Sequence, residues 1–130
     1  MDLQPAETRQ AETVSTWRRA ATLPEVHHAA LLHGAALPGE AARRNLSVRV
    51  GLWLDEAGGV RQARWRAADD AALRDYAEAA CSLLESGADP LALDGEALRH
   101  AVVGAVHGDR ADLVASAIHA ALLVGGPRQT

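Results

Sequence analysis

The sequence predicts one α+β domain that spans residues 1–130, with a small antiparallel sheet and helices packed on one face of it. Three observations lead to this fold class. Apolar and other side chains alternate from Leu46 to Leu54, which is the pattern of a strand with one buried face. A turn rich in Asp and Gly follows, and then a second strand. The remainder of the chain places apolar residues at helical spacing behind three aspartates that can cap helices.

Composition indicates a globular domain and excludes several classes of protein. Apolar residues make up 48% and charged residues 23% of 130 residues, which is enough chain to bury a core. The net charge is −4 and no basic stripe is present, so we expect no nucleic acid as a ligand. No apolar run approaches the roughly 20 residues that span a bilayer, and the N-terminal segment does not resemble a signal peptide. A single cysteine excludes an internal disulfide, and we therefore expect a cytoplasmic protein.

The N-terminal third is predicted to be a flexible tail over residues 1–10, followed by two helices. The first of these helices covers residues 11–22. The second covers residues 24–36, with a proline at its first position, where proline is well tolerated. Leu37-Pro38-Gly39 then ends the helix, and residues 39–45 are predicted to be a polar connection.

The alternating segment and its successor are predicted to pair as a hairpin with strands at 46–54 and 60–67. On the second strand, Trp65 and its alanine neighbours face the core, whereas Arg64 and Arg66 share the solvated face. Trp53 lies on the face opposite the leucines, where it is either covered by the predicted N-terminal helices or exposed as an anchor for a partner. Two strands alone are marginally stable, so the fold requires a third strand or covering helices.

Three helices are predicted after the hairpin. Asp69 can cap the first, which runs to Ser86 and is ended by Gly87. Asp94 can cap the second, whose apolar positions extend to Val106. Asp109 can cap the third.

The stretch VGLWLDEAGGVRQARWRAADDAALRDYAEAACSLLESGADPLAL contains a strand pair, a short loop and a long helix that opens with small and polar residues. This layout resembles the SufE/NifU superfamily of iron–sulfur cluster assembly proteins, and RADLVASAIHAAL resembles the last helix of that superfamily. The resemblance covers residues 44–122 and contains no diagnostic motif. It implies a SufE/NifU-like fold.

The functional cysteines of that superfamily are absent at the matching positions. Asn45 stands where SufE-type proteins carry the cysteine that accepts a persulfide. Arg44, Asp69 or Asp70, and the segment 107–110 stand where NifU-type scaffolds carry three cluster-binding cysteines. Cluster irons are held by thiolates, and persulfide transfer needs a thiolate nucleophile. The resemblance therefore implies a scaffold-like binding or regulatory module without its own iron–sulfur cluster, whose partner is a cysteine desulfurase or another assembly protein.

The same positions supply the candidate site. Arg44, Asn45, Asp69 and Arg110 are the candidate binding residues on this resemblance. If the family fold holds, the loop at 107–110 approaches Asp70 and Arg44.

A second hypothesis assigns a metal to this site. Asp70, His107 and Asp109 would supply one imidazole and two carboxylates, the donor chemistry of a facial triad, for a single Fe or Zn ion. The structural alternative is that the aspartates cap helices and that His107 lies on the surface.

The remaining candidates favour structural roles. Cys81 lies twelve residues beyond Asp69 in a predicted helix and is interpreted as a packed core thiol. His27 and His28 are adjacent and point apart, which is poor geometry for a metal site. Surface or core roles are predicted for them and for the other histidines outside the candidate site, which are His33, His100 and His119.

A third hypothesis is an unrelated α+β interaction domain, including a homo-oligomer. The sequence contains no arrangement that predicts an enzyme, because no Ser-His-Asp set can be argued and Gly58-Gly59 is a hairpin turn. A fold in which residues 44, 70 and 107–110 do not converge would favour this third hypothesis.

Overall fold

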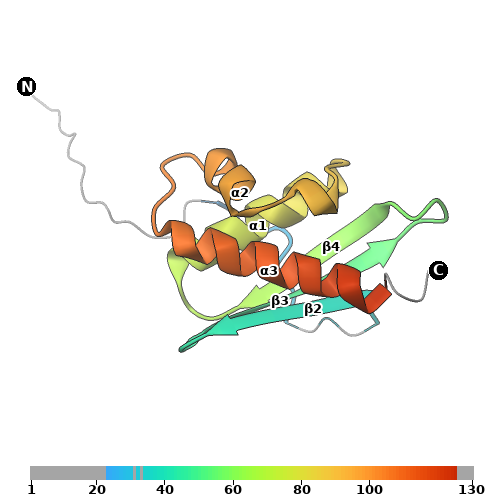
Figure 1. The fold of residues 1–130 in the computed structure, drawn as a ribbon, viewed down its shortest axis with the longest axis horizontal. Coiled ribbons are helices and arrows are strands. Elements are labelled where there is room, and N and C mark those ends of the chain that lie inside the picture. Colours follow the sequence, from blue (N-terminus) through green and yellow to red (C-terminus); the bar gives the residue numbers. More distant parts are fainter. Residues whose placement is uncertain (1–22, 31, 33, 126–130) are drawn as a thin grey trace, which may run out of the picture.

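The computed structural model describes residues 23–30, 32 and 34–125, and it contains a sheet covered by helices on one face (Figure 1). The sheet has three antiparallel strands in the order β2-β3-β4. These strands are β2 (Leu37–Arg43), β3 (Leu46–Leu54) and β4 (Val60–Ala67). Three helices and a short 3-10 helix follow, which are α1 (Ala71–Glu85), η1 (Pro90–Ala92), α2 (Gly95–Ala101) and α3 (Gly108–Gly125). The predicted α+β class is confirmed.

The core lies between the sheet and the helices α1 and α3. Helix α1 packs on β4, and α3 packs on β2 and β3. The central strand supplies Val48, Val50 and Leu52, all at most 1% exposed. Across the β3–β4 pair, Val50 is opposite Trp65, whose side chain is fully buried. The alternation of β3 thus sets the buried face, and the opposite face, here called the outer face, is turned away from the helices (Figure 1).

The helix predicted for residues 24–36 is wrong in the part that the structure describes. Here His28 forms a parallel bridge with Trp65, because the Ala29 N–H donates to the Trp65 carbonyl and the Trp65 N–H donates to the His27 carbonyl. The exposed edge of β4 therefore captures this segment, and Gly34, at φ +87°, interrupts any helix beyond it. The predicted tail at 1–10 and helix at 11–22 lie outside the described residues.

The segment then crosses the outer face. A Cβ atom on Gly51 would lie 2.9 Å from the Ala35 Cβ and 3.4 Å from the Leu32 Cβ, so these residues pack directly on β3. Trp53, which is half-buried, lies beside the same position. Within the described residues, an irregular segment therefore covers this part of the outer face, in place of the predicted N-terminal helices.

The polar connection predicted for residues 39–45 is also wrong, because residues 37–43 form the edge strand β2 and only Arg44 and Asn45 form a turn. Proline is tolerated on an edge strand, where a missing N–H removes no bond to a further strand. Gly39 lies directly beneath α3, and a Cβ atom there would be 2.1 Å from the Ala117 carbonyl oxygen. Strand β2 is thus the third strand, which the fold was expected to require because a two-stranded hairpin alone is marginally stable.

Helix α1 begins one residue later than predicted. The Asp70 carboxylate, not that of Asp69, caps it by accepting the Leu73 N–H at 2.8 Å. Gly87 follows its C-terminus with φ +103°, as predicted, and the N–H of Ala88 donates to the Leu83 carbonyl at 2.9 Å. This is the Schellman arrangement that favours glycine.

The last two helices differ from the prediction at their ends. Asp94 caps α2 as expected, but α2 ends at Ala101, and the residues up to Val106 form a loop. Helix α3 begins at Gly108, so Asp109 lies in its first turn instead of capping it. Of the helices formed by the described residues, none combines the length and the apolar character that a membrane crossing requires.

Candidate functional site

The predicted site positions meet where the N-termini of α1 and α3 lie side by side. The Arg110 guanidinium donates to the Asp70 carboxylate at 3.3 Å, although the two residues are 40 apart in sequence. It also donates to both oxygens of the Asp109 carboxylate, at 3.1 and 2.8 Å. Arg110 therefore bridges two of the predicted acidic residues. We call Asp70, Asp109 and Arg110 the acidic–arginine cluster.

Local structure fixes the members of this cluster. One oxygen of the Asp70 carboxylate caps α1 and the other accepts from Arg110, so the rotamer of Asp70 is set twice. The Tyr76 hydroxyl donates to the Val106 carbonyl at 2.8 Å and ties the loop before α3 to α1. His107 then turns the chain into α3 with φ +54°, a left-handed conformation. Segment 107–110 thus approaches Asp70, as expected from the family fold, whereas its expected approach to Arg44 stays a prediction.

The electrostatics of the cluster follow from these contacts. Hydrogen bonding to Asp109, and then to Asp70, raises the pKa of Arg110 above its ordinary value. Hydrogen bonding from Arg110 lowers the pKa of Asp109, and the positive charge of Arg43 lowers it further. The Arg43 charge acts on Asp109 from the end of β2. The turn at Arg44 and Asn45 follows Arg43 directly, and the side chains of these two predicted binding residues are exposed.

Asp69 lies outside the acidic–arginine cluster. Its side chain is exposed, and its negative charge helps to raise the pKa of Arg74, after the larger effect of the Glu25 hydrogen bond. Arg74 is held by Glu25 at 2.7 Å and lies 5.2 Å from the centroid of the Trp65 ring. Asp69 therefore contributes to the electrostatics on the β4 side of α1.

The predicted metal site finds no support in the arrangement of its residues. Across residues 23–30, 32 and 34–125, no three His, Cys, Asp or Glu side chains are grouped so that they could hold a metal ion. That set includes Asp70, His107 and Asp109. The guanidinium of Arg110 occupies the position between the two carboxylates, and a cation there opposes the binding of a second one. The metal site stays a prediction.

Cys81 is a packed core thiol, as predicted. Its side chain is fully buried on the face of α1 that meets the sheet. Burial, and then the nearby charges of Glu78 and Glu85, raise its pKa far above the ordinary value. A neutral, enclosed thiol is a poor nucleophile and a poor metal ligand.

We expect Cys81 to resist a thiol reagent such as 5,5′-dithiobis(2-nitrobenzoate) in the native protein and to react fully once the protein is unfolded in guanidinium chloride. The matched control is Ser82→Cys, which places a thiol at the next, exposed position of the same helix. One thiol per chain should then react at once in the native variant. Rapid reaction of the native wild-type protein would contradict the packed position of Cys81.

A buried polar network on α1 was not foreseen from the sequence. The Glu78 carboxylate, 5% exposed, accepts the Trp65 indole N–H at 3.0 Å and the His27 backbone N–H at 2.8 Å. The His27 ring is hydrogen-bonded to Glu78 through Nδ1 and to Glu85 through Nε2. The predicted surface or core role of His27 thus takes the form of a half-buried residue that links the N-terminal segment to α1. One feature of the sequence could have indicated this network: the indole N–H of a core tryptophan needs a hydrogen-bond acceptor when it is buried.

Glu85 extends this network to the sheet. Partial burial alone would raise the pKa of Glu85, but hydrogen bonds from the Ala63 N–H, Arg64 and His27 lower it below the ordinary value. The Arg64 contact is 2.6 Å long. Arg64, which was predicted to lie on a solvated face, thus forms an ion pair with Glu85 of α1. Arg66, predicted for the same face, forms no ion pair within the described residues.

The comparisons with known proteins add no assignment to this geometry. No family model matches the chain, and no curated protein matches it. The resemblance to the SufE/NifU superfamily thus continues to rest on the layout of the sequence.

Proposed function

We propose that the protein is a scaffold-like module of iron–sulfur cluster assembly that carries no cluster of its own and binds a partner protein of that system. The partner surface is the end of the domain formed by the acidic–arginine cluster and the turn at Arg44 and Asn45. The observation that carries the proposal is the ion pair between Asp70 and Arg110, because it joins two positions at which the resemblance expects functional cysteines.

The order of the elements supports the same proposal. A three-stranded antiparallel sheet is followed by helices that cover one of its faces, which agrees with the layout expected of a SufE/NifU-like domain. The positive charge of Arg43, at the end of β2, also lowers the pKa of Asp109, which favours a place for the turn at Arg44 and Asn45 on the same surface. The contact between segment 107–110 and Asp70 favours the proposal over an unrelated interaction domain.

The loop that leads into α3 suits a protein partner. Val103 is 96% exposed and Val106 is 59% exposed, both in the loop that leads into α3. Exposed apolar side chains next to charged groups are typical of protein interaction sites. The hydrogen bond from Tyr76 holds the Val106 carbonyl in place, which lowers the entropic cost of ordering this loop on binding.

Binding to a cysteine desulfurase from the same organism tests the proposal. We expect the wild-type protein to bind the desulfurase in isothermal titration calorimetry, and both Arg110→Ala and Val103→Asp to weaken binding by about tenfold or more, because each removes a central contact. Val103 is almost fully exposed, so its substitution should leave the fold intact. Arg61→Ala, at an exposed position of β4, is the control and should bind like the wild type.

Two results would contradict the proposal. One is the absence of binding to the desulfurase and to the other assembly proteins of that organism. The other is binding that Arg110→Ala and Val103→Asp leave unchanged, because the partner would then contact a different surface.

A further inference from the structure

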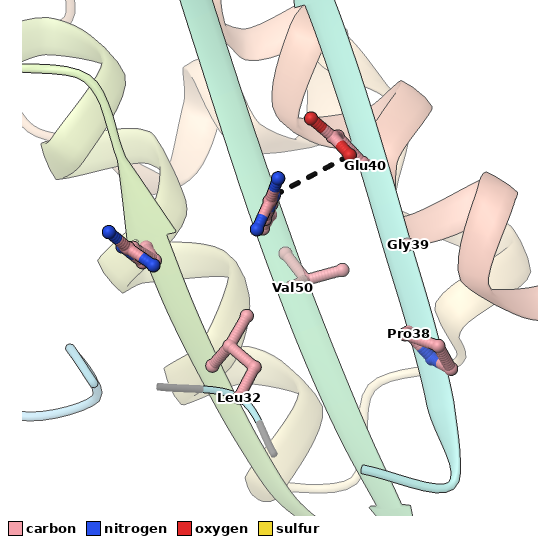
Figure 2. A pocket seen from close by; sticks show the side chains of 7 residues that line it. Leu32, Pro38, Gly39, Glu40 and Val50 are labelled. Carbon is pink, nitrogen blue, oxygen red and sulfur yellow. Dashed lines mark ion pairs between the residues drawn. The ribbon is translucent and has the colours of Figure 1, made fainter. Parts of the chain in front are cut away.

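The outer face of the sheet carries a groove on the side opposite the helices. Its volume is about 520 Å³, and a second cavity of about 270 Å³ continues it toward Ser47. Both are lined by Glu40, Arg49 and Arg66, which come from the three adjacent strands. Figure 2 shows this groove from close by, with Pro38 and Glu40 on β2 at one side and Leu32 at the other.

Two arginines lie next to each other on the floor of this groove. Arg49 of β3 is directly opposite Arg66 of β4 in the register of the sheet. Directly opposite residues of antiparallel strands have Cβ atoms about 4.5–5.5 Å apart, so two guanidinium groups can reach one ligand. Like charges in this position destabilise the strand pair, and a bound anion would remove that repulsion.

The charge of this pair is only partly balanced. Glu40, opposite Arg49 on β2, contacts it at 3.5 Å, and both side chains are about half exposed (52% and 58%). Arg66 forms no ion pair with any residue in the described part of the chain. Arg64, two residues earlier on the same strand, is held by Glu85 at 2.6 Å. In the groove, the carboxylate of Glu40 therefore balances only part of the charge of Arg49 and Arg66. The groove keeps an excess positive charge in a protein whose net charge is −4.

We infer that this groove binds a small molecule bearing a phosphate monoester, with the phosphate between Arg49 and Arg66 and an apolar portion along Pro38 and Leu32. A guanidinium fork matches the oxygen spacing of a phosphate, and the three terminal oxygens of a phosphate monoester can accept from two such forks. The mixed lining of the groove, with charged groups at one part and Pro38 and Leu32 at another, fits a ligand that is charged at one end only.

Phenyl phosphate is a suitable probe, since it joins a phosphate monoester to an apolar ring. We expect it to shift the Nε–H signals of Arg49 and Arg66 in a ¹⁵N NMR titration of the full chain. Arg49→Gln and Arg66→Gln should each raise the Kd by about tenfold, because each removes charge-assisted hydrogen bonds to the ligand. Arg61→Gln makes the same change of charge at an exposed position of β4 and should leave the Kd unchanged.

Two further comparisons sharpen the test. Glu40→Gln removes the competing carboxylate and should lower the Kd several-fold, whereas Glu96→Gln, an exposed change on α2, should have no effect. Benzoate should bind about tenfold more weakly than phenyl phosphate. No binding of phenyl phosphate, or equal losses in Arg61→Gln and Arg66→Gln, would overturn the inferred site. Equal affinity for benzoate would overturn the assignment to phosphate.

Discussion

Gly39→Ala is expected to lower the free energy of unfolding by about 3 kcal/mol, since the added methyl group has no room beneath α3. Its Cβ atom would lie 2.1 Å from the Ala117 carbonyl oxygen and 2.6 Å from the Ala121 backbone nitrogen. These are backbone atoms in the middle of a helix, so no side-chain rotation can relieve the contact. Either α3 or β2 must move, and the apolar surfaces between them would then separate. Urea unfolding followed by circular dichroism measures the change.

Gly59→Ala is the matched control for this substitution. It adds the same methyl group in the exposed turn between β3 and β4, where the nearest atom is a carboxylate oxygen of Asp55 at 3.3 Å. That side chain can give way, and a surface change of this kind usually stays within about 0.5 kcal/mol. If the two alanine variants unfold at the same urea concentration, the close packing of α3 on β2 is wrong.

Glu78→Leu is expected to lower the free energy of unfolding by about 3 kcal/mol, although leucine fills a similar volume. The substitution leaves the Trp65 indole N–H buried without its acceptor, and it releases the His27 backbone N–H as well. Leaving a buried donor unsatisfied costs about 1–3 kcal/mol, which is why an apolar replacement of similar size is still destabilising. Urea unfolding gives the stability, and the NMR signal of the Trp65 indole N–H reports the lost bond.

Glu78→Gln separates hydrogen bonding from shape. The amide oxygen of glutamine can still accept from Trp65, so about half of the loss should be recovered and the indole signal should move less. Equal stability of Glu78→Leu and the wild type would show that the network contributes nothing to folding. Equal losses for Glu78→Leu and Glu78→Gln would show that the negative charge, and not the acceptor oxygen, holds Trp65 and His27.

The sheet illustrates what local sequence can predict. Residues 46–54 and 60–67 are strands in the structure as predicted, because their alternation and the intervening turn are local signals. Strand β2 carried no such signal, since its buried face includes Gly39 and Ala41, whose small size reflects the approach of α3. Its conformation depends on pairing with β3 and on a helix more than 60 residues away. The same dependence on distant contacts explains the error at 24–36, because His28 there forms a bridge with Trp65 of β4 instead of a helical turn.

Of the predicted site positions, the structure joins Asp70, Asp109 and Arg110 by hydrogen bonds. The resemblance placed Asp70 and Arg110 at one site, and their ion pair agrees with that placement. The role of Arg110 as a bridge between two carboxylates depends on side-chain directions, which sequence spacing does not give. Glu78 and Glu85 read as ordinary charged positions on a helix surface, because their partners His27, Trp65 and Arg64 come from two other segments.

The packing of α3 on β2 also has a consequence for synthesis on the ribosome. Residues 37–43 leave the exit tunnel early, but the helix that covers them spans residues 108–125 and is made more than 60 residues later. The hairpin of β3 and β4 can close as soon as it emerges, because its contacts are local. The apolar side of β2 stays uncovered until α3 has left the tunnel, which exposes it to chaperones that bind nascent chains.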